Sequence, residues 1–306
     1  MKTCDKRVWV DAHVHIFAEV ERDAVWFHVE ELLRVLHTDP GHLVWLASLA
    51  RPDYVRLSHT PADYVRLVNQ AQLELQQHMP PGRVFGSVAV HPGAVQASLE
   101  AIDRYGGGHG FVQVGEVLGY ALGFALDSAE MVSIARHAAR LGLPVQCHVS
   151  TTGQPDGEQM RQAVHLAQLV PEARVVAAHA IGGGNTWLHI TAAEVYANMG
   201  GRNLWLEIRD FNRRDFLRAA VERLGANRLI VGTDWIARGK PPYPPYGILF
   251  NVPPEEMPYP SSSYSLEGFL REAGCGDVEV ARIAAENAAE LFRLPLDQNL
   301  STTGLQ

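Results

Sequence analysis

The sequence predicts an α/β protein of the (β/α)8 TIM barrel class, folded as a single domain with long loops after strands 1 and 8. Eight short apolar runs rich in β-branched residues recur along the chain, and each is followed by a helical pattern or a long loop. The runs are apolar on both faces, which is typical of parallel strands covered on both sides. A length of 306 residues suits one such barrel of about 250 residues with extra loops. A doubly wound open sheet is the alternative.

The eight predicted strands are spaced so that a helix or a loop fits between each pair. They are residues 7–12 (RVWVDA), 42–48 (HLVWLAS), 84–90 (VFGSVAV), 111–117 (FVQVGEV), 144–149 (PVQCHV), 174–178 (RVVAA), 203–208 (NLWLEI) and 228–232 (RLIVG). The alternation of strand and helix, repeated eight times, favours a (β/α)8 barrel.

The predicted helices begin and end at capping signals. The helix expected after Thr60 has an N-cap, a proline at its first position and an acid in its first turn, and it continues to about residue 78. A second helix, residues 128–141, ends at a glycine that is soon followed by a proline. The same apolar periodicity predicts three further helices, residues 159–169, 215–224 and 278–292.

Two long segments account for the residues beyond a typical barrel. Residues 17–41 follow the first strand, and the Pro-rich residues 235–265 follow the eighth. Both leave the carboxyl ends of strands, where barrel active sites are built, so they are candidate lids or pocket walls. Four aromatic residues suggest a partly aromatic wall in the second segment: Tyr243, Tyr246, Phe250 and Tyr264. The barrel domain is predicted to span residues 1–295, with 296–306 as a C-terminal tail.

Composition excludes several classes of protein. With 47% hydrophobic and 20% charged residues, the chain is an ordinary globular one rather than a disordered or fibrous one. Its 34 acidic against 26 basic side chains give a net charge of −8, which disfavours nucleic acid and anionic membranes as partners. We expect no secretory signal, since the first ten residues are charged and contain no apolar region. We expect no membrane span either, since no apolar window reaches about 18 residues. Three scattered cysteines favour a reducing, cytoplasmic setting.

Metal-competent side chains gather at the carboxyl ends of the predicted strands. In the first strand His13 and His15 are two residues apart, so the period of two in a strand points both imidazoles to one face. Four others end later strands: Glu116, His148, His179 and Asp234. A barrel would bring all six into one ring, and imidazole mixed with carboxylate suits Zn²⁺ and similar divalent ions.

Several motifs resemble those of a known superfamily. DAHVHIF (11–17), VQCHV (145–149), AAHAIGGG (177–184) and GTDW (232–235) resemble the metal-binding strand ends of the amidohydrolase superfamily, whose members are metal-dependent barrel hydrolases. VAVHPG (88–93) and VGEVLGY (114–120) are similar to the TatD-type branch. The closing segment, residues 281–294, resembles the terminal helix of these families. The order of the motifs along the chain supports the resemblance.

The resemblance implies two metal ions that share a bridging carboxylate. The more buried ion would be held by His13, His15 and Asp234, and the second by His148 and His179, with Glu116 bridging them. Two ions, Zn²⁺ first and Mn²⁺ or another divalent metal as the alternative, can share a water and lower its pKa towards about 7. The bridging hydroxide would be the nucleophile, and Asp234 would act as general base and then general acid.

Three further residues are candidates for substrate contact. His91 ends the third strand in a His-Pro dipeptide, which suits either a substrate contact or a turn. Tyr120 lies shortly after the fourth strand, and Arg209 directly follows the seventh. Cys147, next to His148 on a strand, should point away from the site and pack in the core.

The leading hypothesis is a hydrolase that cleaves an amide or lactone-type C–N or C–O bond of a small molecule. A TatD-type phosphodiesterase or deoxyribonuclease is one alternative, but the chain is acidic and its strand-following loops carry no basic run beyond Arg213-Arg214. A single-metal decarboxylase of the same superfamily is another, and Glu116 discriminates because a bridging carboxylate implies two metals. A non-catalytic metal-binding protein is the third. The oligomeric state, a homo-oligomer included, is left open.

Overall fold

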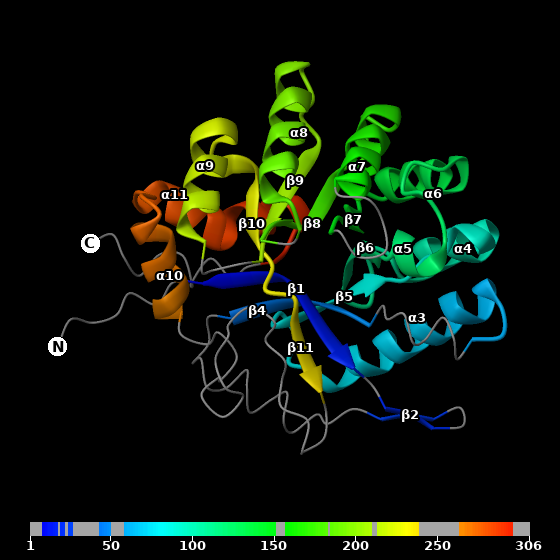
Figure 1. Cartoon of the computed structure of the whole chain (residues 1–306). Helices are drawn as coiled ribbons and strands as arrows, with labels where there is room; N and C mark the ends of the chain where they lie inside the picture. The colour runs from blue at the N-terminus through cyan, green and yellow to red at the C-terminus, as the bar shows by residue number, and fades with distance from the viewer. Residues whose placement is uncertain are drawn as a thin grey trace.

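A sheet of parallel strands wrapped by helices forms the frame of the protein (Figure 1). The computed structural model describes residues 8–17, 19–21, 24–26, 43–49, 58–150, 157–182, 184–209, 213–238 and 263–295. The barrel strands are β1 (Trp9–Phe17), β4 (Leu43–Ser48), β5 (Val84–Val88), β6 (Phe111–Val117), β7 (Val145–His148), β8 (Val175–Ile181), β9 (Leu204–Ile208), β10 (Leu229–Val231) and β11 (Trp235–Arg238).

The eighth barrel strand is split into β10 and β11, and this split closes the barrel. β10 pairs with β9, whereas β11 pairs with β1, both in parallel register. Between the two pieces the backbone amide of Asp234 donates a hydrogen bond of 2.9 Å to the carbonyl of His13. The sheet order is therefore β10-β9-β8-β7-β6-β5-β4-β1-β11, and the first and eighth strands are neighbours. The predicted (β/α)8 barrel is confirmed.

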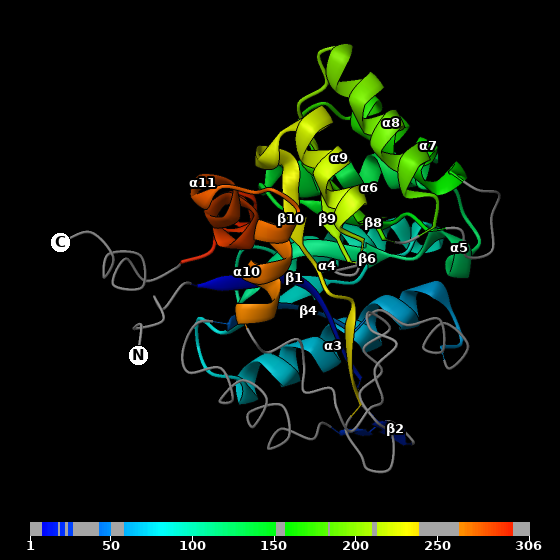
Figure 2. The same ribbon diagram turned by 60° about the vertical axis from the view of Figure 1, so that its left-hand side comes forward.

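Helices pack around the outer side of the barrel, as the turned view also shows (Figure 2). They are α3 (Pro61–His78), α4 (Val95–Tyr105), α5 (Gly119–Leu122), α6 (Ala129–Arg140), α7 (Glu158–Leu169), α8 (Thr186–Asn198), α9 (Arg214–Leu224), α10 (Ser263–Glu272), α11 (Asp277–Ala281) and α12 (Asn287–Phe292). A π-helical turn, η4 (Arg282–Glu286), joins α11 to α12. Within the described part of the chain, no helix has both the length and the apolar character that a membrane crossing requires.

The predicted helices are confirmed to within one or two residues, and their caps explain why. Thr60 accepts a hydrogen bond from the amide of Asp63 at the start of α3, and Ser128 caps α6 through the amide of Met131. The helix predicted at residues 278–292 is the series α11, η4 and α12. Helices α4, α5, α8 and α10 are additional. The outer face of α8 carries exposed apolar residues such as Trp187, so α8 lacks the polar stripe that identifies a surface helix.

The two long segments are structured where they are described. Residues 17–41 contain a short antiparallel hairpin of β2 (Glu19–Glu21) and β3 (Ala24–Trp26). Residues 235–265 begin with β11, and α10 starts near their end. Three of the four aromatic residues predicted to form a wall there, Tyr243, Tyr246 and Phe250, lie outside the described residues, as does the side chain of Tyr264. The predicted tail, residues 296–306, also lies outside them.

Apolar packing fills the amino-terminal end of the barrel. Val10, Leu46, Val176 and Ile230 of four strands form one buried cluster with Phe292 of α12. Cys147 belongs instead to the larger core between strands and helices, as predicted, and burial raises the pKa of its thiol to about 12. With one end of the barrel sealed, the polar side chains of the carboxyl ends are left to form a site.

Candidate metal centre

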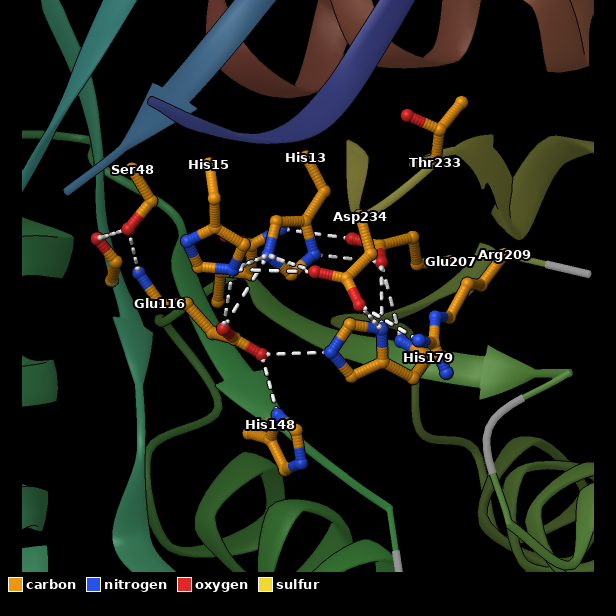
Figure 3. Close-up of polar contacts among 12 residues, drawn as sticks. His13, His15, Ser48, Glu116, His148, His179, Glu207, Arg209, Thr233 and Asp234 are labelled. Atoms are coloured by element: carbon orange, nitrogen blue, oxygen red, sulfur yellow. Dashed lines mark hydrogen bonds and ion pairs between the residues drawn. The ribbon is translucent and has the colours of Figure 1, made fainter. Parts of the chain in front are cut away.

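Four of the six candidate ligands lie where regular strand pairing is interrupted. The register of β1 against β4 shifts around His13, that of β6 against β7 around Glu116, and that of β8 against β9 around His179. Asp234 lies in the gap between β10 and β11. Such irregularities bend a strand and re-aim its side chains. Here they direct side chains from four parts of the barrel towards one point (Figure 3).

Two of the candidate ligands also have left-handed backbone conformations. The φ angle is 62° at His179 and 52° at Asp234, a conformation that costs a non-glycine residue on the order of 1–3 kcal/mol. Gly115, directly before Glu116, has a φ of 131°, and a Cβ atom there would lie 2.5 Å from the carbonyl oxygen of Gln146. The fold thus accepts unfavourable backbone geometry in order to place these side chains.

Glu116 lies at the centre of the group and faces two different pairs of histidines. Its Oε1 is 2.7 Å from His148 Nδ1 and 3.0 Å from His179 Nε2. Its Oε2 is 3.3 Å from His15 Nε2 and 3.4 Å from His13 Nε2. Figure 3 shows the carboxylate between the two pairs. One carboxylate therefore contacts all four imidazoles.

Asp234 completes the His13 side of the site. Its Oδ1 is 3.3 Å from His15 Nε2 and 4.0 Å from His13 Nε2. Its Oδ2 is 3.0 Å from an amino group of Arg209, so the second oxygen is held by a cation.

All six predicted ligands are therefore brought together. Three overlapping groups each offer ligand atoms within 4.8 Å of one another. They are His13–His15–Glu116, His13–His179–Asp234 and Glu116–His148–His179, and every member is buried.

The histidines of the site lower the pKa values of its two carboxylates. Burial raises the pKa of Glu116, but His13 and His148 outweigh it and hold that pKa well below its ordinary range. Burial likewise raises the pKa of Asp234, yet His179, His15 and His13 hold it below its usual value. Both carboxylates are therefore ionised, as binding of a cation requires.

The donor set fits divalent metal. The Nε2 atoms of His13 and His15 are 3.1 Å apart and both face Glu116. His179 Nδ1 is buried and has no hydrogen-bond partner among the described residues. Burial lowers the pKa of His179, which favours the neutral imidazole that metals bind. Converging imidazole nitrogens and carboxylate oxygens of this kind suit Zn²⁺ and similar ions.

The sequence patterns did not single out three residues that support this site. Glu207 in β9 accepts a hydrogen bond of 2.9 Å from His13 Nδ1. Ser48 at the end of β4 accepts one from the amide of Glu116 at 3.1 Å, and Ser150 lies 2.6 Å from His148 Nε2. The signal for Glu207 was present, because it is the one charged residue in the apolar run LWLEI of β9.

The predicted substrate contacts divide into two groups. The ring of Tyr120 lies 4.7 Å from that of His148, centroid to centroid, and Arg209 pairs with Asp234. Burial and the nearby Glu116 raise the pKa of Tyr120 to about 12, so its hydroxyl is a neutral donor at ordinary pH. His91 instead caps the 3₁₀ turn η1 (Pro92–Ala94) by accepting a hydrogen bond from the amide of Gly93 at 2.9 Å. Of the two roles predicted for the His-Pro dipeptide, this geometry corresponds to the turn.

Comparison with solved structures finds the same fold in several enzymes. A dihydroxybenzoic acid decarboxylase from Polaromonas sp. JS666, solved with bound manganese and the inhibitor 2-nitroresorcinol, is 14% identical, with a TM-score of 0.62 over 96% of this chain and 99% of that one. The 5-carboxyvanillate decarboxylase of Sphingomonas paucimobilis is 18% identical, with a TM-score of 0.58 over 86% and 82%. A protein of Pseudomonas putida assigned as a 2-pyrone-4,6-dicarboxylic acid hydrolase is 19% identical, with a TM-score of 0.59 over 95% and 99%. At these identities the likeness shows the fold.

A search among curated proteins found no match to the chain. The amidohydrolase family model matches residues 10–294, which include every candidate ligand. The TatD-type branch stays a prediction, because the match is at the level of the broader family. The protein belongs to the amidohydrolase family and is a metal-dependent enzyme of the amidohydrolase superfamily.

Proposed function

We propose that the protein is a hydrolase with two divalent metal ions that cleaves an amide or lactone-type bond of a small molecule. The observation that carries this proposal is the position of the Glu116 carboxylate. Its two oxygens face separate histidine pairs at 2.7–3.4 Å. A single ion would need only one of these pairs. A carboxylate placed between both pairs reduces the repulsion between two cations.

Each ion has its own set of side chains in this proposal. His13, His15 and Asp234 would hold one, His148 and His179 would hold the other, and Glu116 would serve both. Imidazole nitrogens with few carboxylates favour Zn²⁺, and Mn²⁺ is the alternative that the Polaromonas decarboxylase supports. When bound, the ions supply Lewis acidity and lower the pKa of a coordinated water towards about 7.

Asp234 is the group that moves the proton. It is ionised, because His179 and its other histidine neighbours keep its pKa low in spite of burial. Its Oδ2 accepts the proton of the attacking water and later returns it to the leaving nitrogen or oxygen. Arg209, 3.0 Å from Oδ2, fixes the direction of this oxygen and stabilises the carboxylate when the proton leaves.

The remaining polar groups bind and orient the substrate. The ring of Tyr120 packs against that of His148 at a tilt of 45°. Its hydroxyl stays protonated, so it donates a hydrogen bond to a carbonyl or carboxylate oxygen. Arg209, paired with Asp234, offers a second donor, and its Nε has no hydrogen-bond partner among the described residues. Two donors of this kind suit a substrate that carries an acidic group.

A single-metal decarboxylase is the second candidate function. It is favoured by the fold shared with decarboxylases of dihydroxybenzoic acid and 5-carboxyvanillate. In this case Glu116 would contact substrate or fill the site instead of bridging two ions. The same acidic substrate class would suit Arg209 and Tyr120.

A substrate screen with added Zn²⁺ or Mn²⁺ tests the two proposals against each other. The panel contains aryl amides, lactones including pyrone carboxylates, hydroxybenzoic acids and a phosphodiester. We expect ring opening of a lactone or cleavage of an amide, with no release of CO₂. Release of CO₂ from a hydroxybenzoic acid without hydrolysis would establish the decarboxylase instead, and phosphodiester cleavage alone would contradict both.

A further inference from the structure

A chain of buried polar side chains runs through the interior of the barrel beneath the candidate metal centre. Ser87 of β5, Gln113 of β6, Gln146 of β7 and Glu207 of β9 are each at most 2% exposed. Gln113 Nε2 donates to Ser87 Oγ at 2.8 Å and lies 3.4 Å from Gln146 Oε1. Gln146 Nε2 donates to Glu207 Oε2 at 2.8 Å. The proposed reaction uses none of these four residues directly.

Glu207 is the member of this row of hydrogen-bonded side chains that contacts the candidate metal centre. Its Oε1 accepts from His13 Nδ1 at 2.9 Å and from the backbone amide of His179 at 3.2 Å. A carboxylate only accepts hydrogen bonds, so the proton of the His13 ring is on Nδ1. The lone pair of Nε2 then points the other way, towards Glu116 and Asp234.

We propose that Glu207 is a positioning residue, which fixes the tautomer and ring orientation of His13 so that Nε2 is presented to a metal ion. The amide of Gln146, itself oriented by Gln113, holds the second oxygen of Glu207 in place. This inference rests on the proposed function in taking His13 Nε2 as a ligand. Outer-shell carboxylates on the far nitrogen of a ligating histidine typically change metal affinity by about 10- to 100-fold.

Packing around Gly232 supports a dedicated place for the Glu207 side chain. A Cβ atom at Gly232 would overlap Cδ and Cγ of Glu207, so the glycine that precedes Thr233 and Asp234 leaves room for this carboxylate. The φ angle of Gly232 is not positive, and its backbone would accept alanine. The need for glycine here therefore comes from Glu207.

Stability alone does not account for Glu207. A carboxylate that is fully buried in an apolar strand costs desolvation free energy, and a hydrophobic residue of similar volume is commonly as stable or more stable. Glutamine is also a poor replacement, because the three groups around Glu207 are all donors and an amide nitrogen would face one of them.

Metal titration of purified protein tests the inference with a readout other than activity. The Glu207→Gln variant and wild type are stripped with chelator and titrated with Zn²⁺ in a calorimeter, with Glu194→Gln as the control. Glu194 pairs with Arg223 between the outer helices α8 and α9 and contacts no candidate ligand in the described part of the chain, so the control makes the same substitution away from the site. We expect about 10- to 100-fold weaker binding in Glu207→Gln and unchanged binding in the control. Equal affinity in Glu207→Gln and wild type would overturn the inference and leave the proposed function standing, whereas a wild type that binds no ion would overturn both.

A second pair of variants separates positioning from general damage to the fold. Gly232→Ala should weaken Zn²⁺ binding by pushing Glu207 away from His13, although it removes no polar group. In the Glu207→Ala background the three side-chain atoms nearest to the added Cβ are gone, so the same substitution should add no further loss. Additive losses would contradict the inference.

The ¹⁵N chemical shifts of the His13 ring provide the direct signature of its tautomer. We expect a protonated Nδ1 in wild type and the loss of that single tautomer in Glu207→Gln.

Discussion

Arg209 lies 3.0 Å from Oδ2 of Asp234, and this ion pair joins the end of β9 to the gap between β10 and β11. Both side chains are mostly buried, with 16% and 11% of their surface exposed, so the pair is weakly screened by solvent. Asp234 is consequently held from two sides, by Arg209 at Oδ2 and by His15 at Oδ1. Its position is fixed before any substrate arrives.

Replacement of Asp234 by asparagine should abolish most of the activity while the fold persists. The amide keeps the shape of the side chain but cannot accept and return a proton, so we expect kcat to fall by about 10²- to 10⁴-fold. Steady-state kinetics on the substrate found in the screen, with circular dichroism to confirm folding, measures this. Activity within a few-fold of wild type would remove Asp234 as the proton carrier.

Arg209→Gln should lower kcat/KM by about tenfold or more, because a hydrogen bond to a charged partner is worth about 1.5–3 kcal/mol. Arg209→Lys retains the charge but loses the planar fork, so it should recover part of the activity. Arg214→Gln is a suitable control, because Arg214 forms an exposed ion pair with Glu272 away from the site. A kcat/KM for Arg209→Gln equal to that of the control would contradict the role given to Arg209.

Glu116→Gln should change the number of bound ions. An amide has one acceptor oxygen and no charge, so it cannot bridge two cations, and we expect the metal content to fall from two ions per chain to one. Elemental analysis of protein equilibrated with Zn²⁺ gives the count. A wild-type content of one ion, unchanged in Glu116→Gln, would show that the centre is mononuclear and would favour the decarboxylase.

The candidate ligands could be predicted from the sequence because strand ends in a barrel meet at one face. His13 and His15 share a face by spacing alone, and Glu116, His148 and His179 follow apolar runs that are easy to recognise. The gap in the eighth strand could not be predicted, since the short run RLIVG gives no sign that pairing switches from β9 to β1 after Val231.

Glu207 shows what a pattern of apolar runs leaves out. A single charged residue within LWLEI is compatible with a strand edge, an exposed position or a buried partner, and only the three-dimensional arrangement brings it to His13. In the same way, a His-Pro dipeptide fits both a turn and a substrate contact. The hydrogen bond from Gly93 to His91 is a tertiary detail that distinguishes them.

His91 should make stability depend on pH. Burial lowers its pKa below 6.5, and Nδ1 must stay unprotonated to accept from Gly93. Below pH 6.5 the unfolded chain therefore binds a proton that the folded protein resists, so the free energy of unfolding falls as pH decreases, by at most about 1.4 kcal/mol per pH unit. Above pH 6.5 this contribution is flat.

The variant His91→Asn isolates this effect, because asparagine can still cap the turn but does not titrate. Urea unfolding of both proteins from pH 5 to pH 8 gives the difference in unfolding free energy, in which the other groups cancel. We expect wild type to lose stability relative to the variant as pH falls from about 6.5. Parallel profiles would mean that His91 titrates normally in the folded protein.

Asp11 should help to hold β1 to the interrupted eighth strand. Its Oδ1 accepts from the amides of Thr233 and His13 at 2.9 and 3.2 Å, and its Oδ2 accepts from the Thr233 hydroxyl at 2.6 Å. Asp11→Ala leaves these buried donors without this acceptor, at about 1–3 kcal/mol for each unsatisfied group. With three such donors, we expect a loss of at least about 3 kcal/mol in the free energy of unfolding. Thr233→Val removes only the hydroxyl donor and should cost about 1–2 kcal/mol. Urea denaturation measures both variants, and a loss in Asp11→Ala no larger than that in Thr233→Val would show that the backbone donors find other acceptors.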